Sequence, residues 1–167
     1  MIIKIKSEYT QPLKEYFKMK VLIAYDTKYG NTKKAAELIT DGINSVEGNE
    51  TIINNIKDID LSKDETYELI LIGSPNQYAS PTKTIKQFIN KLSEAPLRGN
   101  SFAVFDTYQL SKHFEIAVKK MEKQISESMP DLIKASPGLS IRVGGARGPI
   151  LEEGLPKCRE FGIKLVK

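Results

Sequence analysis

Residues 21–32 read VLIAYDTKYGNT, a short apolar run that leads directly into a loop of hydroxyl, amide and glycine residues. The run Val21–Tyr25 lacks polar alternation, which is typical of a strand buried on both faces of a parallel sheet. Apolar residues then recur at helical spacing from Thr32 to Val46. A strand, a tight loop and a helix in direct succession predict the first half of a β-α-β unit.

The same alternation continues to the end of the chain. Further strands are expected at residues 51–56, 69–73, 102–105 and 139–143, and further helices at residues 82–92, 110–129 and 151–166. Right-handed crossovers between parallel strands leave chiefly the doubly wound topologies. The sequence therefore predicts an α/β fold in which helices cover both faces of a parallel sheet. Such sheets bind their ligands at the carboxyl ends of the strands.

The composition is that of one globular domain. Of the 167 residues, 40% are hydrophobic and 28% are charged, both ordinary values for a globular protein. No apolar run approaches the roughly 20 residues that span a bilayer, and lysines interrupt the apolar residues of the N-terminus, which makes it a poor signal peptide. One cysteine, Cys158, has no partner for an internal disulfide. We therefore expect a cytoplasmic protein without a membrane partner.

The net charge of +4 arises from 25 Lys and Arg against 21 Asp and Glu. The lysines are spread over the expected helices and form no block of about 5–8 basic residues of the kind that marks a nucleic-acid patch. We therefore expect solvated helix faces and no nucleic-acid partner. With a single histidine, His113, and a single cysteine, the chain supports no metal site and no catalytic triad.

Residues 1–18 differ from the rest of the chain. They begin with alternating isoleucines and continue as a mixed stretch, and Met19 directly precedes the first strong strand. An extra strand, a flexible extension and an upstream start codon all fit this segment. We therefore divide the chain into an N-terminal extension, 1–18, and one domain, 19–167.

The loop from Thr27 to Thr32 has the composition of a phosphate-binding loop. Its glycine permits an unusual backbone conformation, its threonines supply hydroxyl donors, and the helix after it directs free N–H groups at an anion. An ordinary turn with Asn31 or Thr32 as the N-cap fits the same residues equally well. The loop matches neither the nucleotide triphosphatase motif nor the dinucleotide motif.

Residues 21–32 resemble the opening of flavodoxins, in which the pattern [ST]-x-[TYF]-G-N-T binds the phosphate of FMN. The Tyr25-Asp26-Thr27 lead-in is similar to the flavodoxin domain of flavodiiron proteins. The resemblance covers residues 19–166. It implies a flavodoxin-like three-layer sandwich whose five-stranded parallel sheet has the order 2-1-3-4-5, with FMN as the cofactor.

Two later loops carry the same resemblance. Gly73-Ser74-Pro75-Asn76-Gln77-Tyr78 is similar to the family loop along the isoalloxazine, and Phe105-Asp106-Thr107-Tyr108 is similar to the second flavin loop, whose tyrosine stacks on the ring. The resemblance therefore implies an FMN site, without any catalytic or metal-binding residue, that comprises Thr27, Lys28, Tyr29, Gly30, Asn31, Thr32, Ser74, Pro75, Asn76, Gln77, Tyr78, Asp106, Thr107 and Tyr108.

The chain departs from the family pattern in two respects. Many flavodoxins have a glycine in the loop after strand three, and its peptide flips to accept a hydrogen bond from the reduced flavin. This chain has no glycine between Gly73 and Gly99, so a residue of the segment 76–79 would need to take that conformation with more backbone strain. Flavodoxins are also typically acidic, whereas this chain is basic.

The resemblance implies a small electron carrier that exchanges electrons with a redox partner protein or a small acceptor. An FMN-dependent oxidoreductase of the quinone-reductase or protoporphyrinogen-oxidase type on the same fold is the alternative, and an interaction module that has lost FMN is a third. Arg147, in the glycine-rich turn after the last strand, is placed either at the flavin edge or at a partner. A response-regulator receiver is excluded, because strand three ends in Gly73-Ser74-Pro75 rather than in an aspartate. The oligomeric state is left open.

Overall fold

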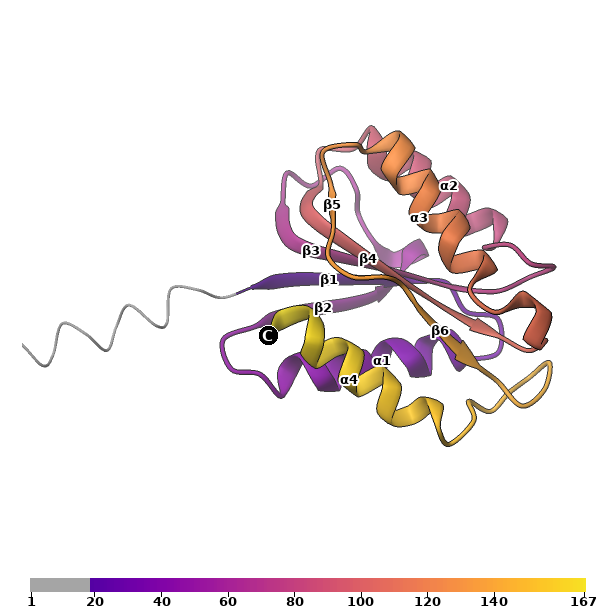
Figure 1. Cartoon of the computed structure of the whole chain (residues 1–167). Helices are drawn as coiled ribbons and strands as arrows, with labels where there is room; N and C mark the ends of the chain where they lie inside the picture. Colours follow the sequence, from indigo (N-terminus) through magenta and orange to yellow (C-terminus); the bar gives the residue numbers. More distant parts are fainter. Residues whose placement is uncertain (1–18) are drawn as a thin grey trace, which may run out of the picture.

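The structure is a computed structural model that describes residues 19–167, so the expectations for residues 1–18 lie outside the described residues. One parallel sheet forms the centre of the fold (Figure 1). Its strands are β1 (Lys20–Tyr25), β2 (Glu50–Asn55), β3 (Thr66–Pro75), β4 (Arg98–Tyr108), β5 (Ile133–Lys134) and β6 (Leu139–Arg142). The order β2-β1-β3-β4-β5 confirms the predicted 2-1-3-4-5 topology.

The fifth strand position is shared by two short segments. β5 pairs with Ser101 and Phe102 of β4, and β6 pairs with the end of β4 from Phe105 to Tyr108. Between them lies Pro137, whose missing N–H cannot extend a ladder. The expected strand at 139–143 is therefore β6, and the short β5 was not predicted.

Helices cover both faces of the sheet (Figure 1). The first pair comprises α1 (Asn31–Asn44) and α4 (Gly154–Val166), and the second comprises α2 (Lys83–Ser93) and α3 (Ile116–Ser128). Short 3-10 turns, η2 (Ile56–Asp58) and η3 (Ser111–His113), come after β2 and β4. The three-layer arrangement that the resemblance implied is confirmed. No helix in the described part of the chain is long and apolar enough to cross a membrane.

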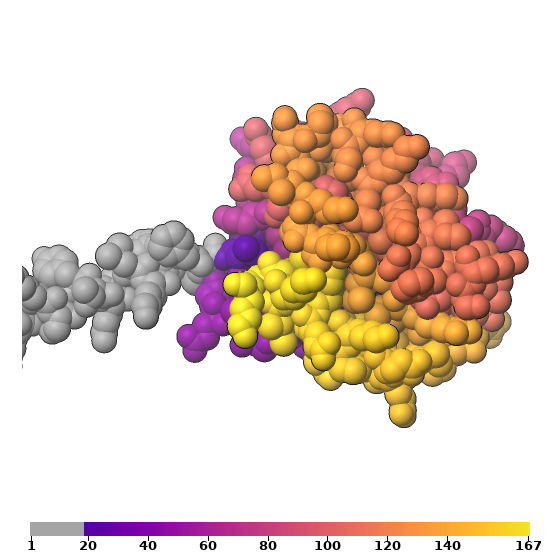
Figure 2. Space-filling view, in the orientation of Figure 1, coloured from indigo at the N-terminus to yellow at the C-terminus, as the bar shows by residue number. Residues whose placement is uncertain are grey.

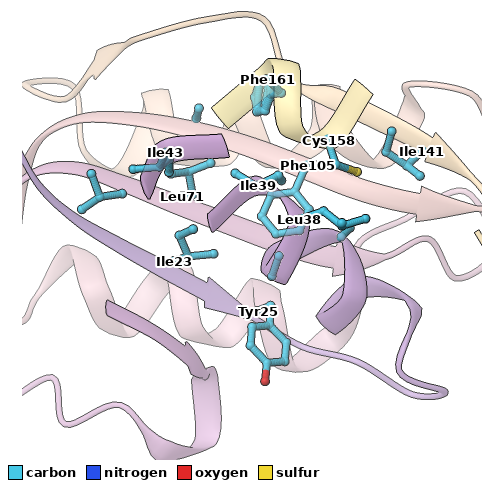
Figure 3. Packing of buried hydrophobic residues seen from close by; sticks show 14 of the residues in the cluster. Ile23, Tyr25, Leu38, Ile39, Ile43, Leu71, Phe105, Ile141, Cys158 and Phe161 are labelled. Atoms are coloured by element: carbon cyan, nitrogen blue, oxygen red, sulfur yellow. The ribbon is translucent and has the colours of Figure 1, made fainter. Parts of the chain in front are cut away.

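The sheet is buried on both faces because successive residues of its strands point to opposite sides. Ile23 belongs to the apolar cluster under α1 and α4, whereas Leu22 belongs to the cluster under α2 and α3. Figure 3 shows residues of the first cluster, with Leu38 and Ile39 of α1 close to the ring of Phe105. A continuous apolar strand such as Val21–Tyr25 is therefore required by the fold, as its sequence pattern indicated.

Two element boundaries differ from the prediction in the segment that connects β4 to α3. β4 continues to Tyr108 rather than ending at Phe105, and α3 begins at Ile116 rather than at Leu110. The helix cannot extend backwards because Glu115 has a left-handed φ of 61°. Leu110 and Phe114, which the helical spacing placed on a buried face, are instead 47% and 51% exposed.

Candidate functional site

The carboxyl ends of β1, β3 and β4, with the loop after β6, surround a cavity of about 300 Å³. This volume lies at the lower end of the range of about 300–1,000 Å³ for small-molecule sites. Of the fourteen residues predicted for the site, ten line the cavity: Thr27, Lys28, Tyr29, Asn31, Thr32, Pro75, Asn76, Gln77, Tyr78 and Thr107. The structure thus brings together three loops that the sequence had connected only by resemblance.

The loop after β1 brings the N-terminus of α1 to this cavity. Gly30 has a φ of 92°, and the hydroxyl of Thr27 accepts a hydrogen bond of 3.0 Å from its N–H. Gly30 is the N-cap of α1, and no side chain caps the helix. The alternative in which Asn31 or Thr32 is the N-cap is therefore wrong. The first-turn N–H groups, together with the positive end of the helix dipole, suit an anion.

Thr32 joins this loop to β4. Its side chain is buried, and its hydroxyl lies 2.8 Å from the hydroxyl of Thr107. Both threonines also line the cavity. A hydroxyl of this kind can donate to a bound anion while it accepts from its neighbour.

A second group of hydroxyls, on the side away from the cavity, forms hydrogen bonds that hold the loop after β3 in place. The carboxylate of Asp26 accepts hydrogen bonds from the hydroxyls of Thr82 (2.8 Å) and Thr84 (2.6 Å). Thr82 is also the N-cap of α2, and its N–H donates to the hydroxyl of Ser74 at 3.0 Å. Ser74 therefore supports the wall of the cavity rather than lining it. Sequence reasoning missed the roles of Asp26 and Thr82, although a threonine directly before a helical pattern is a recognisable N-cap signal.

The loop after β3 turns through two residues in the left-handed region. Tyr78 and Ala79 have φ values of 53° and 61°, and the backbones of Gln77 and Ser80 exchange two hydrogen bonds of 2.8 and 3.1 Å across them. Both central residues of such a turn normally favour glycine or asparagine. The backbone strain expected for this glycine-free loop thus falls on Tyr78 and Ala79. Tyr78 is 97% exposed at the edge of the cavity.

Alternation along β4 decides which of its last residues face the cavity. Thr107 and Gln109 line it, whereas Asp106 and Tyr108 do not. Tyr108 packs against Phe114, with the ring centroids 5.6 Å apart, and lines a separate cavity beside β6. The interpretation of Tyr108 as the stacking residue does not agree with this placement, because a strand that continues to Tyr108 cannot direct both Thr107 and Tyr108 to one side.

Asp106 is a buried carboxyl group behind the cavity. Its side chain is completely inaccessible, the hydroxyl of Ser140 donates to one of its oxygens, and the other oxygen has no hydrogen-bond partner among the described residues. Burial, as the main cause, raises the pKa of Asp106 to about 7, and the nearby Glu115 acts in the same direction. Asp106 therefore holds a proton over most of the pH range below neutrality.

The loop after β6 completes the cavity. From this loop the sequence analysis named only Arg147, at the flavin edge or at a partner, and missed Val143 and Ala146. Both of these residues line the cavity. A side chain at Gly148 would collide with the amide of Asn31, so this loop lies directly against the loop after β1. Arg147 stands over the ring of Tyr29 at 5.8 Å, and Lys28 stands over the same ring at 5.3 Å. No motif in the sequence marks Val143 or Ala146, because neither residue is polar.

Comparison with known proteins assigns this arrangement to a family. A family model described as flavodoxin matches residues 23–161. The chain belongs to the flavodoxin family. A flavodoxin from Clostridium saccharobutylicum is 33% identical over 89 residues, which cover 53% of this chain and 56% of that protein. The matched part thus spans little more than half the length of this relative.

Solved structures agree with the family. A flavodoxin from the domain Archaea has a TM-score of 0.74 and 26% identity over 89% of this chain and 96% of its own. The Flv1 flavodiiron core from Synechocystis shares the fold, with a TM-score of 0.68 and 17% identity over 99% of this chain and 40% of its own. Flavodoxins bind FMN. The uncapped N-terminus of α1, the two threonine hydroxyls and the adjoining cavity of this flavodoxin fit a phosphorylated cofactor of that kind.

Proposed function

We propose that this flavodoxin binds FMN in the cavity formed by the loops after β1, β3, β4 and β6, and that it carries electrons to and from a redox partner. The domain that carries this function spans residues 19–167. The observation that supports it most directly is the N-terminus of α1, where the free N–H groups meet the hydroxyls of Thr27 and Thr32 at the cavity. FMN supplies reversible electron transfer when bound, and the protein supplies binding and orientation.

The side chains around the cavity divide into two groups under this proposal. Thr27, Asn31 and Thr32 would hold the phosphate, together with the free N–H groups in the first turn of α1. Tyr29, Tyr78 and Gln77 would border the ring system, with Tyr29 or Tyr78 in the stacking position that Tyr108 does not occupy. Aromatic stacking contributes roughly 1–3 kcal/mol in comparable contacts with bases. Asp106 does not line the cavity and would not contact FMN.

The phosphate assignment is tested by comparing FMN with riboflavin in a fluorescence titration. Charge-assisted hydrogen bonds contribute about 1.5–3 kcal/mol each, so riboflavin is expected to bind far more weakly than FMN. Thr32→Ala removes one hydroxyl and should weaken FMN binding by roughly tenfold or more. Thr40→Ala is the matched control, because Thr40 lies on the same helix and donates only to the carbonyl of Ala36. Equal affinities for FMN and riboflavin would refute the assignment.

A further inference from the structure

The positive charge of the chain is concentrated around the cavity. We define the rim as residues 27–34, 75–84, 107–114 and 143–150, which include the loops that form the cavity. The rim contains no aspartate or glutamate and six cations: Lys28, Lys33, Lys34, Lys83, Lys112 and Arg147. From totals of 25 Lys and Arg and 21 Asp and Glu, the rest of the chain retains 19 cations and 21 anions. The rim thus carries six positive charges, whereas the rest of the chain has two more anions than cations. The excess of positive charge therefore lies in the rim.

The rim cations are not neutralised by neighbouring carboxylates. None of the six takes part in an ion pair within residues 19–167. Three carboxylates directly flank the rim in sequence. Asp26 accepts from the backbone of Thr27 and from two threonine hydroxyls, the inaccessible Asp106 accepts from the hydroxyl of Ser140, and Glu115 pairs with Lys119 at 3.4 Å. None of these carboxylates forms an ion pair with a rim cation within residues 19–167.

Large apolar side chains are exposed at the same end of the molecule. Five large hydrophobic residues of the described chain are exposed, and four of them lie in the rim: Tyr29, Tyr78, Leu110 and Phe114. The loops that carry them are tied together, because the side chain of Asn76 donates to the carbonyl of His113 and Lys120 donates to the carbonyl of Ala79. In Figure 2 the loop after β4 lies on the surface at the right-hand end, away from the C-terminus.

Apolar side chains surrounded by polar and charged residues are the usual composition of a protein docking surface. A nucleic acid would also meet the cations and the rings of Tyr29 and Tyr78, but Leu110 offers no ring for base stacking and the ring of Phe114 already packs against Tyr108. The six cations are also distributed over all four segments of the rim and form no block of basic residues of the kind that marks a nucleic-acid patch. The observations favour a protein whose carboxylates surround an apolar centre.

We propose that the rim is the docking surface for an acidic redox protein, which would meet Leu110, Phe114 and Tyr78 with its apolar centre and the rim cations with its carboxylates. The inference rests on the proposed electron-transfer function and names the partner's chemistry. Complementary charge raises the rate of encounter, by about 10-fold to 10³-fold in steered associations, and salt screens it. A small interface of this kind releases its partner rapidly, as weak redox complexes do.

The test uses the FMN-loaded protein and an acidic [2Fe–2S] ferredoxin as the probe. The second-order rate at which reduced ferredoxin reduces the flavin is measured by stopped flow at low and at high salt. The double variant Lys83→Glu with Lys112→Glu reverses two rim charges outside the proposed cofactor contacts. Lys164→Glu with Lys167→Glu changes the net charge equally at the opposite end of the molecule, near the C-terminus (Figure 1). The rim variant should react roughly tenfold more slowly at low salt than the control variant.

Equal rates in the two variants would overturn the docking proposal and leave the cofactor assignment intact, provided that both bind FMN as the unsubstituted protein does. Absence of FMN binding would overturn the proposed function instead. In that case calorimetric titration of the same ferredoxin into the two variants decides the docking proposal, with weaker binding expected only for the rim variant. A thymidine 20-mer or phosphatidylglycerol vesicles that bind the unsubstituted protein more tightly than the ferredoxin does would reassign the rim and overturn the proposal.

Discussion

Replacement of Asp106 by asparagine is expected to remove a large pH dependence from the stability of the fold. Asp106 is inaccessible, and burial raises its pKa from 3.8 to about 7. Because the pKa is higher in the folded chain than in the unfolded chain, the folded protein holds this proton more tightly. The stability that the proton contributes is complete below the unfolded pKa and is lost as the pH rises through about 7.

The size of the effect comes from the shift. Each pKa unit corresponds to about 1.4 kcal/mol, so a shift of about three units corresponds to about 4 kcal/mol over the whole range. By the linkage relation, about 3 kcal/mol of this stability is lost between pH 5 and pH 8. Asp106→Asn retains an acceptor for the hydroxyl of Ser140 but cannot ionise. The groups that face this carboxyl, Asn76, Ser140 and Glu115, are unchanged in the variant.

The assay is urea unfolding of the unsubstituted protein and of the variant at several pH values from 5 to 8. The unsubstituted protein should lose about 3 kcal/mol more of its free energy of unfolding across this range than Asp106→Asn does. Asp131→Asn, which removes an exposed carboxylate, serves as the control and should show the slope of the unsubstituted protein. Parallel pH curves for the unsubstituted protein and Asp106→Asn would show that burial does not hold the proton, and would refute the reasoning.

Two further predictions concern the backbone. Ala79→Gly relieves the strain of a left-handed residue with a φ of 61°. After the flexibility that glycine adds to the unfolded chain is subtracted, the free energy of unfolding measured with urea should rise by about 0.5–1 kcal/mol. A decrease would contradict the strained turn. Gly162→Ala places a methyl group closer to the carbonyl oxygen of Ile39 than van der Waals contact allows, where α4 packs against α1. The melting temperature should fall, with a loss of about 1–3 kcal/mol in the free energy of unfolding. An unchanged melting curve would contradict this close helix contact.

Most of the fold is predictable from the period of the apolar residues. Continuous apolar runs such as 69–73 became central strands, and the amphipathic stretch 82–92 became α2 with a shift of one residue at each end. The prediction failed where helical spacing continued outside a helix. Leu110 and Phe114 extend the apolar face of α3 in the sequence, yet the left-handed Glu115 separates them from it. Spacing alone cannot reveal a backbone reversal at a residue that is neither glycine nor proline.

The candidate site was predictable where a backbone conformation requires a particular residue. Gly30 and the threonines around it mark the loop after β1 in the sequence itself, and the structure places Thr27 and Thr32 at the cavity. Tyr108 shows the limit, because its direction depends on where β4 ends. A strand that ends three residues later than predicted directs Thr107 to the cavity and Tyr108 away from it. Val143 and Ala146 carry no chemical signal and enter the site only through the position of their loop.

The two aspartates nearest the cavity show why its surroundings are positive. Asp26 and Asp106 both lie at the ends of strands that border it, where an exposed carboxylate would repel a phosphate. Asp26 is occupied by two threonine hydroxyls and the N–H of Thr27, and Asp106 does not face the cavity and keeps its proton up to a pKa of about 7. Asp106 therefore adds no charge beside the rim below about neutral pH, and Asp26 directs its oxygens at its hydrogen-bond donors and does not line the cavity. One arrangement thus serves an anionic cofactor inside the cavity and an acidic partner outside it.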